Sequence, residues 1–207
     1  MAISFKVDVQ LPYRLVQNMQ KMNPKTSWNK NECMPTIASS AYVDDMASII
    51  GDVRLGEEVY VGPCVSLRAD EASPIIIGDK CNIQDGVVFH GLMGSCIELG
   101  KKVSIAHGAV IHGPMKIGDE SFVGFNSVVH ASTLGEKCFV GHAAAVIGVS
   151  LADGKFVPHG AVVDSQEKAD SLGAVPDALK HFNDEVVEVN REFASSYGVR
   201  RKSCVGN

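Results

Sequence analysis

The chain is short of basic charge and of long apolar runs, and each shortage excludes a class of protein. Its 19 Lys and Arg residues are scattered and are outnumbered by 24 Asp and Glu, which gives a net charge of −5. A nucleic-acid-binding surface is therefore not expected. No apolar run approaches the roughly 20 residues of a membrane-spanning helix. The first residues also lack the charged and then apolar layout of a secretory signal. We expect neither a nucleic-acid partner nor membrane insertion.

The cysteines show no CxxC spacing and form no dense framework. This usage is typical of a reduced compartment and predicts a cytoplasmic location. Cys81 and Cys138 fall at small inward positions of the repeat described next, so we interpret them as core residues. The sequence assigns no redox role to Cys204. The six cysteines are Cys33, Cys64, Cys81, Cys96, Cys138 and Cys204.

What the chain does contain is a repeat of six residues. Aliphatic side chains recur at Val43, Ile49, Leu55, Val61 and Leu67. A period of six matches neither a helix nor a flat strand, whose periods are 3.6 and 2. It is typical of a parallel β-helix, in which three hexapeptides make one triangular coil. The predicted fold class is an all-β solenoid, and glycines that follow the aliphatic residues indicate tight corners.

The repeat divides the chain into four segments. Residues 1–35 carry no hexapeptides and are predicted to be an N-terminal extension and cap, with a short helix over 11–22 and Trp28 covering the open end of the coils. Residues 36–165 form the β-helix, 166–198 the C-terminal helices and 199–207 a tail.

The C-terminal segment changes from a period of six to a helical period. A short helix follows Ser165, and Pro176 and Asp177 precede a longer helix that is expected to run to Tyr197 and to end at Gly198. We expect its apolar face to pack along the coils or across a subunit boundary. That face consists of Leu179, Phe182, Val186, Val189 and Phe193.

Two steps in the repeat are ten residues long instead of six. They predict corner loops that bulge outward at 69–74 and 91–96. Loops beside a rigid scaffold commonly carry function.

The register also predicts which distant side chains stand side by side. The residues that follow the aliphatic positions of one face form a column one strand spacing apart, about 4.8 Å. A second column occupies the next corner. The first column is Arg68, His90, His112 and His130, and the second is Asp85, His107 and Phe125.

This arrangement indicates a metal site. His90 and His112 are close enough in register to share one ion, because zinc binds imidazole nitrogen at about 2.0–2.1 Å. His107 is a third candidate around a corner, and a neighbouring subunit of a threefold assembly would supply it if its own chain cannot. Three histidines with an open fourth position are typical of catalytic zinc. His130 is interpreted as structural, and His142, His159 and His181 as surface residues. The polar residues predicted to surround the ion are Arg68, Asp70, Glu71, Asn82, Gln84 and Asp85.

The same residues resemble those of the γ-class carbonic anhydrases and the related amino-terminal domain of the carboxysome scaffold protein. The resemblance runs from about Trp28 through the C-terminal helix. The motif consists of Arg68-Ala69-Asp70-Glu71, the stretch Asn82-Ile83-Gln84-Asp85-Gly86-Val87-Val88-Phe89-His90, His107, and His112-Gly113-Pro114.

The resemblance implies a homotrimer of left-handed β-helices with Zn²⁺, Fe²⁺ or Co²⁺ at the subunit interfaces. His90 and His112 would bind the metal from one subunit and His107 from its neighbour. Arg68 would pair with Asp85 across the interface, and Asp70 would join that network. Gln84 and Glu71 would line the catalytic pocket, and Asn190 would reach it from a neighbouring subunit.

The implied activity is the reversible hydration of CO2 to bicarbonate by a metal-bound hydroxide. Glu71 is the first candidate to accept the released proton and Glu188 the second. The loop after His90 is shorter than in the archaeal family member, and Met93 stands where that protein has its proton-shuttle glutamate. The native metal and the turnover rate are not determined by the sequence.

Two alternatives stay open. One is a hexapeptide acyltransferase or thioesterase that acts on a coenzyme A ester, with one histidine as general base and no metal. The other is a non-catalytic assembly subunit that keeps the trimer and the site. Metal analysis distinguishes the first alternative from a carbonic anhydrase, and a CO2-hydration assay distinguishes the second.

Overall fold

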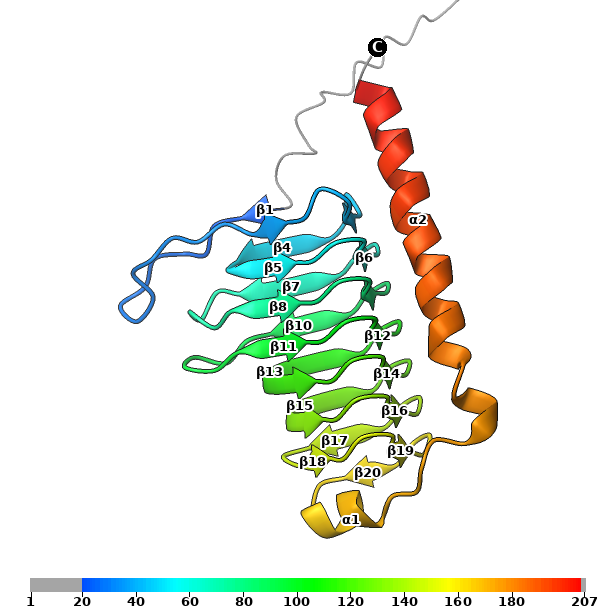
Figure 1. Cartoon of the computed structure of the whole chain (residues 1–207). Helices are drawn as coiled ribbons and strands as arrows, with labels where there is room; N and C mark the ends of the chain where they lie inside the picture. Colours follow the sequence, from blue (N-terminus) through cyan, green and yellow to red (C-terminus); the bar gives the residue numbers. More distant parts are fainter. Residues whose placement is uncertain (1–19, 206–207) are drawn as a thin grey trace, which may run out of the picture.

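The computed structural model describes residues 20–205, with side chains through residue 199. It is a left-handed parallel β-helix with a long C-terminal helix alongside (Figure 1). The predicted fold class is confirmed. Of the helix expected over 11–22, residues 11–19 lie outside the described part. Its last residues instead form a strand, β1 (Gln20–Lys21), which pairs in parallel with β4 (Ser48–Gly51). That part of the prediction is wrong.

Short parallel strands line three faces, which we call A, B and C. Face A contains β1, β4, β7 (Ser66–Ala69), β10 (Val88–His90), β17 (Ala145–Ile147) and β20 (Val162–Val163). Face B contains β2 (Thr36–Ile37), β5 (Val53–Leu55), β8 (Ile75–Ile77), β11 (Ile97–Leu99) and β18 (Ser150–Leu151). Two longer strands, β13 (Val110–Ile117) and β15 (Val128–Leu134), continue from face A to face B. Face C contains β3 (Tyr42–Val43), β6 (Tyr60–Val61), β9 (Asn82–Ile83), β12 (Ser104–Ile105), β14 (Phe122–Val123), β16 (Phe139–Val140) and β19 (Phe156–Val157).

The core is one continuous cluster formed by the residues of the six-residue repeat. On face A, Phe89 is paired with Leu67 in one neighbouring coil and with Ile111 in the other, so each coil is offset by 22 residues here. All three side chains are fully buried. Burying a side chain of this size stabilises the fold by about 1.5–3 kcal/mol. The periodic aliphatic positions therefore hold the coils in register.

The corners explain the frequent glycines. A Cβ on Gly78 would lie 2.3 Å from the carbonyl oxygen of Gly100, in the next coil. No side chain can be accommodated at that distance, because the stacked backbones already touch. The predicted tight corners are present at such positions.

The two ten-residue steps form the expected loops. One connects β7 to β8 and the other connects β10 to β11. In Figure 1 both loops project from the same side of the coil stack. The loop 91–96 begins directly after His90, so it borders one of the predicted metal ligands.

The described N-terminal residues, 20–35, form an extended arm beside the first coils (Figure 1). Trp28 in this arm is 58% exposed. The expectation that its ring covers the open end of the core is therefore wrong for this chain.

The C-terminal segment contains α1 (Gln166–Ser171), the 3-10 helix η2 (Asp177–Leu179) and α2 (Phe182–Val205). The short helix is present, and the side chain of Ser165 caps it by accepting a hydrogen bond from the Lys168 N–H. The expected end at Gly198 is wrong, because α2 continues through it to Val205. No helix within residues 20–205 is both long enough and apolar enough to cross a bilayer.

The expected apolar face of the C-terminal segment packs on the coils in part, because Leu179, Phe182 and Val186 lie against a buried cluster there. Packing of the remaining residues across a subunit boundary stays a prediction. Val189 and Phe193 are exposed, whereas the buried stripe is Asn183, Val187, Asn190 and Ala194. The amide nitrogen of Asn183 donates hydrogen bonds to the carbonyl oxygens of Lys102 and Glu120 on the coil corners. These bonds turn a polar side chain toward the coils, which hydrophobic spacing alone cannot predict.

Candidate metal centre

The predicted first column is present along face A. His90 is paired in register with Arg68 on one side and with His112 on the other, and His112 is paired with His130. The ring centroids of His90 and His112 are 5.2 Å apart, and those of His112 and His130 are 5.0 Å apart. Histidines separated by 18 and 22 residues thus become direct neighbours.

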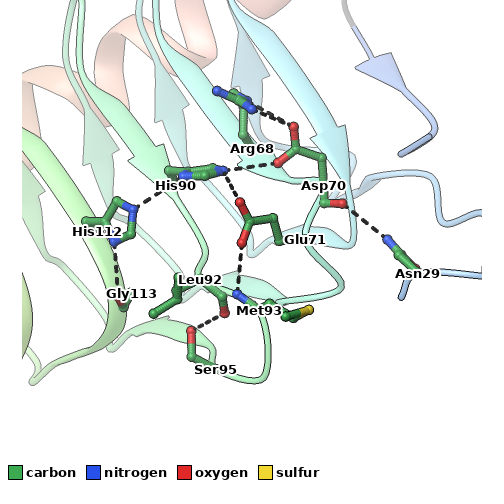
Figure 2. Close-up of polar contacts among 10 residues, drawn as sticks. All are labelled: Asn29, Arg68, Asp70, Glu71, His90, Leu92, Met93, Ser95, His112 and Gly113. Carbon is green, nitrogen blue, oxygen red and sulfur yellow. Dashed lines mark hydrogen bonds and ion pairs between the residues drawn. The ribbon is translucent and has the colours of Figure 1, made fainter. Parts of the chain in front are cut away.

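The nearest contact in this column joins two ring nitrogens. Nδ1 of His90 lies 3.3 Å from Nε2 of His112 (Figure 2). The other nitrogen of His112, Nδ1, lies 3.1 Å from the carbonyl oxygen of Gly113. A carbonyl only accepts hydrogen bonds, so Nδ1 of His112 carries the proton and its Nε2 presents a lone pair to His90.

The other side of His90 faces two carboxylates. Its Nε2 lies 3.3 Å from Oδ1 of Asp70 and 3.5 Å from Oε1 of Glu71. The angles do not satisfy a hydrogen bond, and Nε2 of His90 and Oδ1 of Asp70 are buried without a hydrogen-bond partner in the described chain. In the tautomer that carries the proton on Nε2, beside these carboxylates, Nδ1 of His90 also presents a lone pair toward His112.

This pair of imidazoles fits a metal ion. In that tautomer two lone pairs face each other at 3.3 Å, and they repel unless a cation or a proton lies between them. Two nitrogens at 2.0–2.1 Å from one tetrahedral zinc ion are about 3.3–3.4 Å apart. The carbonyl on the far side of His112 also provides the outer hydrogen bond that ligating histidines commonly make.

A single chain does not complete the site. Within the described residues, no group of three or more His, Cys, Asp or Glu side chains is arranged to hold a metal ion. His107 follows face C at the corner before face A, whereas His90 ends the face A strand. His107 and His90 therefore lie at opposite edges of face A, in neighbouring coils.

The second predicted column is also present. Nδ1 of His107 lies 3.7 Å from Oδ2 of Asp85, and its ring centroid is 5.4 Å from that of Phe125. The side chains of His107 and Asp85 are each 54% exposed. His107 is thus free of the core at an edge that a neighbouring molecule could reach.

Arg68 and Asp70 form an ion pair within the chain. Nη2 and Nε of Arg68 donate to Oδ2 of Asp70 at 2.8 and 3.1 Å. Burial would raise the pKa of Asp70, but the hydrogen bonds and charge of Arg68 outweigh it and hold that pKa below its ordinary value. The pairing of Arg68 with Asp85, which the family resemblance implies across an interface, stays a prediction.

Glu71 is fixed between the histidine column and the loop after His90. Its Oε2 accepts a hydrogen bond of 3.1 Å from the backbone N–H of Met93, while Oε1 faces His90 (Figure 2). The sequence shows no signal for this contact, because a backbone donor carries no side-chain signature.

Four other predicted site residues lie away from His90 in this chain. Gln84 donates to Asn82, which donates to Ser104, in a buried row on face C. Asn190 is buried on α2 and donates to the carbonyl oxygen of Val186. Glu188 pairs with Arg191 on the same helix. The catalytic roles expected for these residues stay predictions.

Fold and site together define a hexapeptide-repeat β-helix with a column of histidines along one face. The chain is 41% identical over 196 residues to the carbonic anhydrase of Methanosarcina thermophila, covering 84% of this chain and 79% of that protein. It is 38% identical over 184 residues to the carboxysome assembly protein CcmM of a Nostoc species. That match covers 84% of this chain but only 33% of CcmM.

The solved structures support the fold alone. An acetyltransferase-like protein from Bacillus cereus superposes with a TM-score of 0.72 at 23% identity, covering 86% of this chain and 97% of that one. A hexapeptide transferase family protein from Anaplasma phagocytophilum gives 0.67 at 24% identity, covering 80% and 93%. No protein-family model matches the chain. On the strength of the Methanosarcina relative, of which the match covers 79%, the chain belongs to the γ-class carbonic anhydrase family.

Proposed function

We propose that this protein catalyses the reversible hydration of CO2 to bicarbonate at the three subunit interfaces of a homotrimer. In each site His90 and His112 of one subunit and His107 of its neighbour hold a divalent metal, Zn²⁺ or else Fe²⁺ or Co²⁺. The observation that carries the proposal is the 3.3 Å approach of Nδ1 of His90 to Nε2 of His112, which is the separation of two nitrogens bound to one tetrahedral zinc ion. The cytoplasmic location expected from the cysteine pattern is part of the same proposal.

When bound, the metal supplies Lewis acidity that lowers the pKa of water from 15.7 to roughly 7. The protein supplies orientation and proton transfer. Gly113 fixes the ring of His112 through its carbonyl oxygen. Arg68 holds the Asp70 carboxylate beside His90.

CO2 hydration releases a proton in each turnover, and Glu71 would receive it. One of its oxygens faces His90, and the side chain is 35% exposed. The carboxylate therefore has one side toward the site and another toward solvent. The hydrogen bond from the Met93 N–H keeps it in that orientation.

The experiment tests complementation between two variants that are each expected to be inactive. In a trimer that shares its ligands, His112→Ala removes a ligand from one side of each interface and His107→Ala removes the ligand on the other. Each variant alone should lose stoichiometric metal and CO2-hydration activity. When the two are co-expressed at equal levels, about a quarter of the interfaces combine intact halves, so about a quarter of the wild-type activity should return.

His181→Ala is the matched control, since His181 is exposed and away from the column. It should keep full activity and metal content. Mixed assemblies that stay inactive, or a single variant that keeps its metal, would contradict a shared site.

A second candidate function is a non-catalytic assembly role. It is favoured by the likeness to CcmM and by an apolar residue, Met93, in the loop beside the site. Metal-replete protein that hydrates no CO2 would support this candidate. The acetyltransferase-like structures share under 25% identity with the chain, so they lend no support to coenzyme A chemistry.

A further inference from the structure

The N-terminal arm of residues 20–35 makes a direct contact with the candidate metal centre. The side-chain nitrogen of Asn29 donates a 3.3 Å hydrogen bond to the backbone carbonyl oxygen of Asp70, 41 residues away (Figure 2). Asn29 is buried, although its neighbour Trp28 is exposed. The arm thus turns a polar side chain, and not its tryptophan, toward the body of the protein.

Local hydrogen bonds hold Asn29 in place. Its N–H donates to Oγ1 of Thr26 at 2.9 Å, and the Thr26 N–H donates to the Asn29 carbonyl oxygen at 2.9 Å. Asn23 closes the base of the arm, because its side chain donates to the Asn31 carbonyl oxygen and accepts from the Cys33 N–H. The arm therefore presents the Asn29 amide from a closed loop.

The carbonyl that accepts this bond belongs to the peptide that joins the two carboxylate residues beside His90. The carbonyl of Asp70 and the N–H of Glu71 belong to one planar peptide unit. Fixing that carbonyl fixes the orientation of the plane from which both residues extend. Asp70 and Glu71 are the two carboxylates that face Nε2 of His90. Asn29 thus acts on both carboxylates through a single peptide plane.

We propose that Asn29 is a positioning residue that aligns the Asp70 and Glu71 carboxylates with the metal-binding histidines. It contacts neither the histidines nor the substrate and acts through the peptide between residues 70 and 71. Its effect on metal binding rests on the proposed function, whereas its effect on the loop does not.

The test compares Asn29→Asp with Asn31→Asp. Both substitutions remove an amide and add one negative charge to the same arm, but Asn31 is exposed and contributes its backbone carbonyl to the hydrogen bond with Asn23. Asn29→Asp cannot donate to the Asp70 carbonyl. We expect it to weaken Zn²⁺ affinity about tenfold in a chelator competition, as loss of an outer hydrogen bond at a metal site commonly does. Asn31→Asp should bind zinc like the wild type.

A second readout does not depend on metal or activity. In metal-free protein, loss of the Asn29 bond should loosen Glu71 and thereby speed amide hydrogen exchange at Met93, which donates to Glu71. Asn29→Ala should show the same change and replaces Asn29→Asp if that variant does not fold. Faster exchange at Met93 in a protein that binds no zinc would overturn the proposed function and keep the positioning role. Unchanged exchange with unchanged zinc affinity in a folded Asn29 variant would overturn the positioning role.

Discussion

Phe125 and His142 stack face to face across neighbouring coils, with ring centroids 4.2 Å apart and planes only 6° apart. The backbone N–H of Phe125 donates to Nδ1 of His142 at 3.0 Å. The N–H of His142 in turn donates to Nδ1 of His159, whose ring is stacked 4.7 Å away. Each imidazole thus accepts a backbone hydrogen bond, which it can do only at an unprotonated nitrogen.

This ladder predicts a loss of stability in mild acid. Burial, and next the proximity of His159, lower the pKa of His142 below its ordinary value of 6.5. The unfolded chain therefore binds this proton more readily than the folded one. The stabilisation is complete above pH 6.5 and is lost as the pH falls toward the lowered pKa.

His142→Phe keeps the stacking and removes the titrating group. Its Tm should fall less than that of the wild type between pH 7.5 and pH 5, as measured by thermal unfolding followed by circular dichroism. His181→Gln removes an exposed histidine and should retain the wild-type pH dependence. An identical fall in Tm for His142→Phe and the wild type would show that protonation of His142 contributes nothing.

The packed core predicts a large cost for a cavity on face B. Ile117→Ala removes most of a side chain that is 1% exposed, and it should lower the free energy of unfolding by about 2–5 kcal/mol. Urea unfolding measures the change. Lys116→Ala is the control, because this neighbouring side chain points to solvent, and it should cost under about 0.5 kcal/mol. Equal costs for the two variants would contradict the assigned register.

The fold and the histidine columns could be predicted because they follow from the register alone. A period of six places every sixth residue inside, and the ten-residue steps then align His90 with His112. The site could not be completed in the same way, because its remaining contacts use groups without a sequence signature. The Met93 donor is a backbone N–H, and the Asp70 acceptor of Asn29 is a backbone carbonyl.

The errors at the C-terminal helix have a physical cause. Hydrophobic spacing predicted one apolar face that includes Val189 and Phe193. Both are exposed in the single chain, and Asn183 turns toward the coils instead, where it bonds two corner carbonyls. Gly198 was expected to end the helix, yet a glycine inside a helix costs only about 1 kcal/mol relative to alanine. The hydrogen bonds of the neighbouring helical turns can offset that free-energy cost, and α2 continues to Val205.

The cysteines should differ sharply in reactivity. Burial raises the pKa of the Cys81 thiol to about 12, and its Sγ donates to the Gly100 carbonyl oxygen. Cys138 is also buried, whereas Cys64 and Cys96 are exposed. Iodoacetamide at pH 8 should therefore modify Cys64 and Cys96 in the native protein and leave Cys81 and Cys138 unmodified, as read by peptide mass spectrometry. Modification of all four before unfolding would contradict the assigned core.

The short loop after His90 predicts dependence on external buffer. Met93 is exposed in the loop beside the proposed site and cannot carry a proton, so in the proposed reaction Glu71 would pass its proton directly to solvent molecules. The CO2-hydration rate at saturating CO2 should then rise with imidazole concentration, because buffer removes protons faster than water does.

Met93→Glu adds a carboxylate to the same loop and keeps the backbone N–H that holds Glu71. It should raise the rate at low buffer by about tenfold and flatten the imidazole dependence. Met93→Gln, which has a similar shape without a titrating group, should behave like the wild type. If Met93→Gln raised the rate as much as Met93→Glu, the loop would act through shape and not through proton transfer.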